Sequence, residues 1–317
     1  MVRTRVLHSD GHVQVTDTIA AARSPAPGGT IWVDLVASTE VGLATLLPEW
    51  RFHPLALEDC LHEQRRSKYE RYPGHDFLVL QALDRATTDE LDTIPIRVLV
   101  KPGLVVTVRQ RPSSALDHVA ALFAEDTERV GQGSDRVVHA LLDAIVDEFT
   151  PLLESWEAEL DAIEDRMGAR PEENPVEAII AMRRRLLNVL RQMAPLQEVV
   201  RRLQDGTETT ESGRIYYRDV HDHIVAVTDS AVLLKEVCDG LMRVQTERGN
   251  ERLNKVMKYL AIVSTLMLPM TVISGVFGMN FDVIPTAHAE QGFWGALAMM
   301  LASALVLVLW FVRKGWL

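Results

Sequence analysis

Two long runs of apolar residues near the C-terminus dominate the hydrophobic pattern of this chain. The first covers residues 259–279 and the second covers residues 293–312, and neither contains a charged side chain. A helix needs about 20 apolar residues to cross the hydrocarbon core of a bilayer. The pattern therefore predicts two membrane spans, joined by a short loop over residues 280–292.

Basic residues flank the two spans on the sides that face away from this loop. They are Arg252, Lys255, Lys258, Arg313 and Lys314. The loop itself carries Asp282 and Glu290 but no Lys or Arg. Since Lys and Arg beside membrane spans stay on the cytoplasmic side, we expect a multi-pass protein of the plasma membrane with both termini in the cytoplasm and the loop outside.

The two spans differ in their polar content. The second is almost entirely Ala, Leu, Val and Met, which suits contact with lipid. The first contains Ser, Thr and Gly residues and is followed by Asn280. Polar groups at this depth line an aqueous path or allow helices to pack closely. Two spans cannot enclose a pore, so a pore would require a cyclic homo-oligomer.

The N-terminal third mixes strand and helix patterns. Residues 29–36 and 75–83 are apolar runs typical of strands, and residues 94–110 form a predicted hairpin around a Lys-Pro-Gly turn. A helix is expected over residues 53–64 between the first two strands. We therefore predict a cytoplasmic α/β domain over residues 1–130.

The chain after residue 130 is predicted to be helical. We expect one helix from residue 134 to about 167, a second over about 175–203, and a third from about 213 to 279. The third has an apolar seam at alternating intervals of three and four, which is typical of helix packing. This seam contains Ile224, Val227, Ala231, Leu234, Cys238 and Leu241. The resulting division is a helical hairpin and cytoplasmic stalk over residues 131–258, followed by a transmembrane domain over 259–317.

Composition and charge narrow the function. The chain has 317 residues and a formal net charge of −11. The part after residue 250 contains five basic and three acidic residues, so the excess negative charge lies before it. An acidic surface disfavours nucleic acid and suits cations. The chain has no GxxxxGK phosphate loop, and its two cysteines form no CxxC pair, so ATP hydrolysis and a cysteine-type zinc site are not expected.

The end of the first span carries a recognisable motif. Gly278, Met279 and Asn280 follow the segment NKVMKYLAIVSTLMLPMTVISGVF, and the chain ends in RKGWL. The motif and its flanks resemble the CorA family of magnesium channels, and the segments HPLALEDCL and YYRDVHDH are similar to parts of its soluble domain. The resemblance implies a funnel-shaped homopentamer that conducts Mg²⁺, with Co²⁺ or Ni²⁺ as secondary ions, and is not an enzyme.

This resemblance also implies roles for individual residues. Gly278, Met279 and Asn280 would form the selectivity filter, because neutral oxygens can bind the water shell that Mg²⁺ is reluctant to lose. Asp282 and Glu290 in the outer loop would attract cations. Five residues would line the pore and its gate, namely Asn254, Met257, Leu260, Leu268 and Thr271.

The family resemblance further implies that cytoplasmic Mg²⁺ binds between subunits and closes the pore. Asp219 matches one ligand of this regulatory site, and Asp84, or else Asp89, is expected to be the other. The outer loop lacks the acid that relatives carry after a proline, and histidines flank Asp222. A Zn²⁺ transporter of the related ZntB branch therefore stays open as an alternative, as does a membrane-tethered sensor or enzyme.

Overall fold

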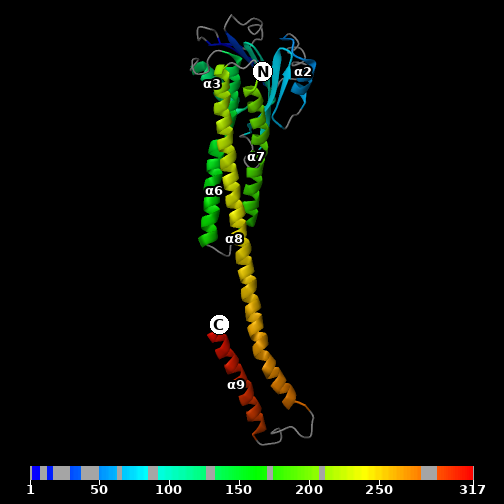
Figure 1. Cartoon of the computed structure of the whole chain (residues 1–317), viewed down its shortest axis with the longest axis vertical. Coiled ribbons are helices and arrows are strands. Elements are labelled where there is room, and N and C mark those ends of the chain that lie inside the picture. The colour runs from blue at the N-terminus through cyan, green and yellow to red at the C-terminus, as the bar shows by residue number, and fades with distance from the viewer. Residues whose placement is uncertain are drawn as a thin grey trace. The chain divides into compact units, whose positions relative to one another are not determined.

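The computed structural model describes ten stretches of the chain. They are residues 2–7, 13–16, 29–36, 50–62, 66–84, 92–125, 133–169, 174–206, 211–279 and 291–316. The chain divides into two compact units, Met1–Leu241 and Met242–Leu317. The first contains a sheet and its covering helices, and the second contains two apolar helices (Figure 1).

Unit 1 is built on a seven-stranded sheet with the order β2-β1-β3-β7-β6-β5-β4. Its strands are β1 (Val2–Leu7), β2 (Val13–Thr16), β3 (Thr30–Val36), β4 (Lys68–Tyr72), β5 (His75–Leu83), β6 (Thr93–Lys101) and β7 (Leu104–Arg109). β3 and β7 pair in parallel, and the other neighbours pair antiparallel. The predicted strands over 29–36 and 75–83 and the predicted hairpin are confirmed.

Helices cover both faces of this sheet. On one face, Ile31, Val33 and Leu35 of β3 pack with Ala56 and Cys60 of α2 (Pro54–Leu61). On the other face lie α3 (Ser114–Glu125), α5 (Ser134–Asp147) and α7 (Val176–Gln204). A strand that is buried on both faces needs apolar side chains at consecutive positions, which explains why β3 is apolar from Ile31 to Val36 at every position except Asp34.

A network of buried polar side chains lies on the face of the sheet that α3 covers. The indole nitrogen of Trp32 donates to Oγ1 of Thr107 at 3.0 Å, and this hydroxyl donates to Asp34 at 2.8 Å. Asp34 and Arg109 form an ion pair at 2.9 Å, and their side chains are 2% and 3% exposed. Arg109 also contacts Asp117 of α3 at 3.0 Å. The network satisfies charges that would be costly to bury alone.

The helical part differs from the sequence prediction in one place. Instead of one helix from 134 to about 167, the structure has α5 and a separate α6 (Phe149–Ala169), divided at Glu148. Pro151 explains the break, because proline has no N–H to donate to the preceding turn and its ring clashes with that turn's carbonyl group. Proline is tolerated in the first turn of a helix, which is where it lies in α6.

Three helices run side by side in the lower part of unit 1 (Figure 1). They are α6, α7 and the first part of α8 (Glu211–Phe277). Arg185 of α7 pairs with Glu159 of α6 at 2.9 Å, and Arg183 pairs with Asp239 of α8 at 3.0 Å. All six residues of the predicted α8 seam are buried. Cys60 and Cys238 are both free and buried.

Unit 2 consists of the rest of α8 and helix α9 (Gly292–Arg313). Ile262, Ala296 and Phe311 are its buried apolar residues, and Lys258 of α8 donates to the carbonyl oxygen of Gly315 at 3.2 Å. Both helices are long and apolar enough to cross a membrane, and only 6% of each apolar window is buried. The exposed apolar surface of these two helices is therefore suited to contact with lipid or with a further helix.

Candidate functional site

The membrane part of α8 has one face that is covered by protein. Ile262 is 5% exposed and most other residues of this part are exposed. The partly buried residues are Lys258, Leu266, Pro269, Met270, Ile273 and Phe277. Together with Ile262 they recur at intervals of three or four along the helix, so they share one side. Lys258 on this side donates to the carbonyl oxygen of Gly315, directly after α9, so the side that is covered faces α9.

The predicted pore-lining residues lie on the opposite side of the same helix. At about 100° per residue, Met257, Leu260, Thr271 and Gly278 lie about 140 to 180° around the axis from Ile262. Leu268 lies about 120° from it, and only Asn254, at about 80°, falls toward the flank. The face that α9 leaves free therefore carries most of the residues assigned to the pore.

The free face is uncovered in the described part of the chain. Met257, Leu260 and Leu268 are 64%, 60% and 67% exposed. Thr271 is also exposed, and its hydroxyl donates to the carbonyl oxygen of Met267 at 2.9 Å. That internal bond uses the only hydroxyl proton, so the Thr271 oxygen can act toward any other group only as an acceptor, with both of its lone pairs.

The GMN motif stands at the end of α8. Gly278 donates its N–H to the carbonyl oxygen of Ser274 at 2.9 Å, and Met279 donates to Val276 at 3.3 Å, so the chain leaves the helix through a final turn. A Cβ at Gly278 would lie 3.0 Å from the Ser274 carbonyl oxygen, so a side chain there would be crowded. Asn280 lies outside the described residues.

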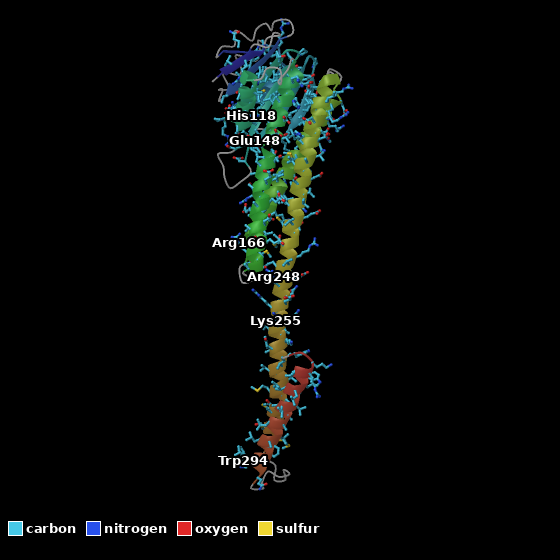
Figure 2. All side chains as sticks on the ribbon, turned by 90° about the vertical axis from the view of Figure 1, so that its left-hand side faces the viewer. His118, Glu148, Arg166, Arg248, Lys255 and Trp294 are labelled. Carbon is cyan, nitrogen blue, oxygen red and sulfur yellow. The ribbon has the colours of Figure 1, made fainter. Side chains whose placement is uncertain are left out.

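Side chains typical of a membrane surface lie toward both ends of unit 2. Arg248 and Lys255 lie toward one end, and Trp294 lies toward the other (Figure 2). Lys and Arg collect beside membrane spans on one side, and Trp is enriched at both membrane–water interfaces. The outer-loop candidates Asp282 and Glu290 lie outside the described residues.

The two carboxylates proposed as regulatory ligands have different surroundings within one chain. Asp84, at the end of β5, is largely buried and forms an ion pair with Arg111. Asp219 on α8 is 58% exposed and lies 3.9 Å from the His139 imidazole. No contact joins the two aspartates among the described residues. The second choice for the partner, Asp89, lies outside them.

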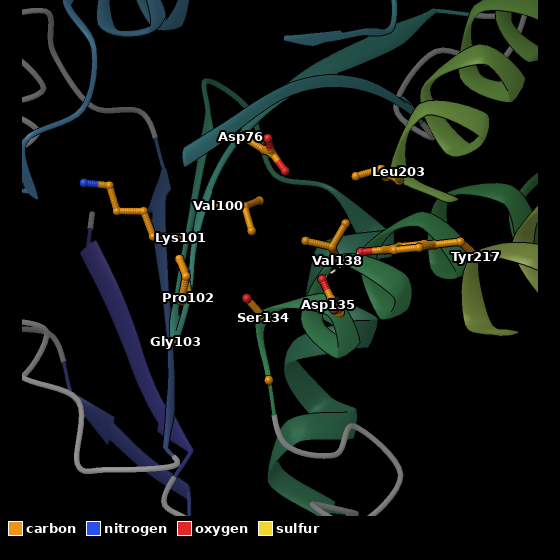
Figure 3. A pocket seen from close by; sticks show the side chains of 11 residues that line it. Asp76, Val100, Lys101, Pro102, Gly103, Ser134, Asp135, Val138, Leu203 and Tyr217 are labelled. Atoms are coloured by element: carbon orange, nitrogen blue, oxygen red, sulfur yellow. Dashed lines mark hydrogen bonds between the residues drawn. The ribbon is translucent and has the colours of Figure 1, made fainter. Parts of the chain in front are cut away.

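A pocket of about 270 Å³ opens between the β6–β7 turn and the start of α5 (Figure 3). The Tyr217 hydroxyl donates to Asp135 at 3.4 Å, and Asp76 pairs with Arg71 at 3.1 Å. The Lys101 side chain points away from the pocket and donates to the carbonyl oxygens of Trp50 and Arg51. Because its charged groups already have partners, we assign no ligand to this pocket.

Comparisons with known proteins agree with these features. The sequence model described as "CorA-like Mg2+ transporter protein" matches residues 27–314. The cobalt/magnesium transport protein CorA of Thermotoga maritima is 28% identical over 291 residues, which cover 90% of this chain and 83% of that protein.

Two solved structures have the same fold. The complete CorA magnesium transporter of Methanocaldococcus jannaschii superposes with a TM-score of 0.84 at 22% identity, over 100% of this chain and 99% of that one. The ZntB cytoplasmic domain of Vibrio parahaemolyticus gives a TM-score of 0.65 at 15% identity, over 78% of this chain and 98% of that one. At these identities, the likeness establishes the fold alone.

The family match spans both units and includes both apolar helices. It confirms the predicted fold class, an α/β domain followed by a long helix and two C-terminal membrane helices. It also confirms that the chain is not an enzyme. The chain belongs to the CorA family and is a membrane-embedded transporter of divalent cations.

Proposed function

We propose that the protein is a passive Mg²⁺ channel in which several copies of α8 surround a common axis. The observation that carries this proposal is the free face of α8, which lies opposite the face covered by α9 and holds most of the assigned pore residues. One copy of α8 cannot enclose a pore on that face by itself. A ring of copies, five by the family resemblance, would turn it inward and leave α9 toward the lipid.

The GMN motif would form the selectivity filter at the outer end of this ring. Asn280 would contribute neutral amide oxygens, and Gly278 would bring backbone carbonyls close to the axis because it has no side chain. Mg²⁺ keeps several of its waters when bound, so oxygens that accept hydrogen bonds from those waters select the ion without stripping it. Asp282 and Glu290 would raise the local cation concentration at the entrance.

The gate would lie deeper along the same face. Met257, Leu260 and Leu268 would form apolar rings, and Thr271 a polar ring between them and the filter. Narrow apolar constrictions block ions by excluding water. Opening would then require the α8 helices to move apart or to rotate, so that the rings widen and fill with water.

Cytoplasmic Mg²⁺ would hold the gate closed by binding between Asp219 of one subunit and Asp84 of the next. Two facing carboxylates repel when empty and are joined by a bound cation, so occupancy would favour the closed ring. Asp84 is paired with Arg111 in the single chain. The ion would therefore have to displace this guanidinium group or share the carboxylate with it.

Proteoliposome uptake tests the proposed function. Asn280→Ala should abolish Mg²⁺ uptake, and Asn250→Ala is the matched control because Asn250 is an exposed amide before the first span. Full uptake by Asn280→Ala would contradict the filter assignment. Uptake of Zn²⁺ without Mg²⁺ by the wild-type protein would favour the ZntB-like alternative, and uptake of neither ion would favour the tethered sensor.

The same assay tests the gate when internal Mg²⁺ is varied. Asp219→Ala should require more internal Mg²⁺ for closure than the wild-type protein, while its open-state uptake stays normal. Asp222→Ala, which removes a neighbouring exposed carboxylate, serves as the control. Identical closure curves for Asp219→Ala and the wild type would contradict the regulatory role of Asp219.

A further inference from the structure

Three basic side chains gather at one end of unit 2, where the apolar runs of both helices stop. Lys255 precedes the first apolar run by four residues, and Arg313 and Lys314 directly follow the second. Lys258 joins the two helices at this end, because its ammonium group donates to the carbonyl oxygen of Gly315 at 3.2 Å. This hydrogen bond places the end of α9 beside the turn of α8 that contains Lys258.

Lys255 lies on the side of α8 that faces α9. It precedes the buried Ile262 by seven residues, which is almost two full helical turns, so the two residues share one side. It also precedes Lys258 by three residues and therefore lies about 4.5 Å farther from the apolar run. Its side chain is exposed, at the end of unit 2 that lies away from Trp294 (Figure 2). Lys255 is thus directed to the same region as the end of α9.

The end of α9 is held in place by a C-terminal cap. Gly315 has a φ of 68°, and its N–H donates to the carbonyl oxygen of Val312 at 3.1 Å. The N–H of Trp316 donates to the carbonyl oxygen of Phe311 at 2.9 Å. These two bonds form the Schellman motif, in which a residue with positive φ turns the chain back after the last helical turn. The Trp316 ring stacks on the Phe311 ring, with their centroids 5.7 Å apart, so the cap fixes an aromatic side chain next to the two cations of α9.

These three cations have no counter-charge among the residues that the structure describes. All three are exposed, and none of them forms an ion pair there. The described acidic residues of unit 2 are Glu247 and Glu251, which both lie on α8 before Lys255. Like charges held at one end of the unit repel one another, and an anion bound between them would remove that repulsion.

An exposed apolar surface of α9 leads directly to these charges. Val306, Trp310 and Arg313 are spaced by four and three residues, so they share one side of the helix. Val306 and Trp310 are both exposed, as is Trp316 of the cap. Trp is enriched where the hydrocarbon of a membrane meets the headgroups. One molecule that has both a phosphate group and acyl chains would therefore contact the cations and the apolar side of α9 together.

The chemistry of these groups indicates a phospholipid with a negatively charged headgroup. Arg binds phosphate oxygens through two parallel N–H donors, and Lys binds them as a point charge. A zwitterionic headgroup carries a cation of its own, which the three basic side chains would repel, and inorganic phosphate would make no use of the apolar side of α9. We propose that Lys255, Arg313 and Lys314 bind the headgroup of an anionic phospholipid, whose acyl chains lie along Val306 and Trp310.

Tryptophan quenching in a bilayer tests this proposal. The full-length protein is placed in phosphatidylcholine vesicles, and part of the lipid is replaced by phosphatidylglycerol whose brominated acyl chains quench nearby indole rings. Brominated phosphatidylcholine gives the reference. Trp310 and Trp316 report on this end of unit 2, whereas Trp294 contributes equally in every variant. The wild type should be quenched at a lower fraction of the brominated anionic lipid than of the brominated zwitterionic lipid.

Removing one cation should weaken this preference. Lys255→Gln should lower it about fivefold, which corresponds to the contribution of one basic residue near an anionic membrane surface. Arg243→Gln is the matched control, because Arg243 is an exposed cation of α8 that lies about 22 Å before Lys258 along the helix. It should keep the wild-type preference. The double variant Arg313→Lys with Lys314→Arg should keep it as well, since both charges remain.

Three results would overturn the proposal. The first is equal quenching of the wild type by the two brominated lipids. The second is an equal loss of preference in Lys255→Gln and Arg243→Gln, which would indicate a general attraction between charges. The third is loss of the preference when inorganic phosphate is added at the concentration of the lipid, which would indicate a site for soluble phosphate. If Lys255→Gln misfolds, Lys314→Gln gives an independent test with the same expected loss. These measurements need no ion transport, so they are independent of the proposed channel function.

Discussion

The apolar side chains along helix α8 are buried at its seam in unit 1 but largely exposed in unit 2. Before Leu241, its seam is buried against the helices of unit 1, and Leu234 is only 6% exposed. In the membrane part, Leu260 and Leu268 are exposed although they are just as apolar. Unit 1 thus completes its core within one chain, whereas unit 2 leaves most of its described apolar surface uncovered, as lipid and the proposed ring of copies would require.

The largest effect is expected from breaking the buried ion pair between Asp34 and Arg109, which tests whether the core of unit 1 is complete. Arg109→Ala would leave the Asp34 carboxylate buried without its partner, which should lower the free energy of unfolding by about 3 to 5 kcal/mol. Urea unfolding of the full-length protein in detergent, followed by circular dichroism, measures this. Arg71→Ala removes an exposed partner of Asp76 and should cost about 1 kcal/mol or less. Equal losses of unfolding free energy in Arg109→Ala and Arg71→Ala would contradict the conclusion that unit 1 has a complete core within one chain.

A smaller effect is expected on the seam of α8. Leu234→Ala should lower the free energy of unfolding of unit 1 by about 2 to 5 kcal/mol, because it leaves a cavity in a packed interface. Leu233→Ala, at an exposed position one residue earlier, should change it by about 0.5 kcal/mol or less. The same urea experiment compares them. A large loss in Leu233→Ala would mean that the other side of the helix is also packed.

The smallest expected effect on stability is in unit 2, where the readout is transport. Leu268→Ser places a hydroxyl in the proposed apolar constriction, so water should enter it more readily and Mg²⁺ uptake into liposomes should rise. Leu301→Ser makes the same change on an exposed position of α9 and should leave uptake near the wild-type level. If Leu301→Ser raised uptake and Leu268→Ser did not, the wrong helix would have been assigned to the pore.

Much of the fold was predictable because its elements have strong local patterns. α8 has no proline before residue 269 and keeps its seam spacing, so its 67 residues were expected as one helix. The two-sided burial of β3 likewise left a run that is apolar except at Asp34. β1 and β2 were not predicted, because their arginines, threonines and glutamine obscure the strand alternation. The break before α6 was missed because the apolar spacing of three and four continues across Pro151, from Ile145 through Phe149 to Leu152.

The candidate site was only partly predictable. The free face of α8 follows from helical spacing once one covered residue is known, but the sequence does not show which face α9 covers. The contact between His223 of α8 and Asp143 of α5, at 3.1 Å, was missed because the two residues are 80 positions apart and meet only through the packing of the two helices. The sequence did not distinguish His221 from His223. In the structure they contact different helices, because side chains two residues apart on a helix point to opposite sides.

The order of strands in the sheet also affects how the protein avoids aggregation. An exposed sheet edge offers unpaired backbone groups to another chain. At one edge, α7 covers β4, and Arg202 donates to the Tyr69 carbonyl oxygen at 3.5 Å. The other described edge is β2, which has only four residues. One edge is therefore capped and the other is short, which would limit strand addition when copies of the chain come close together in the proposed ring.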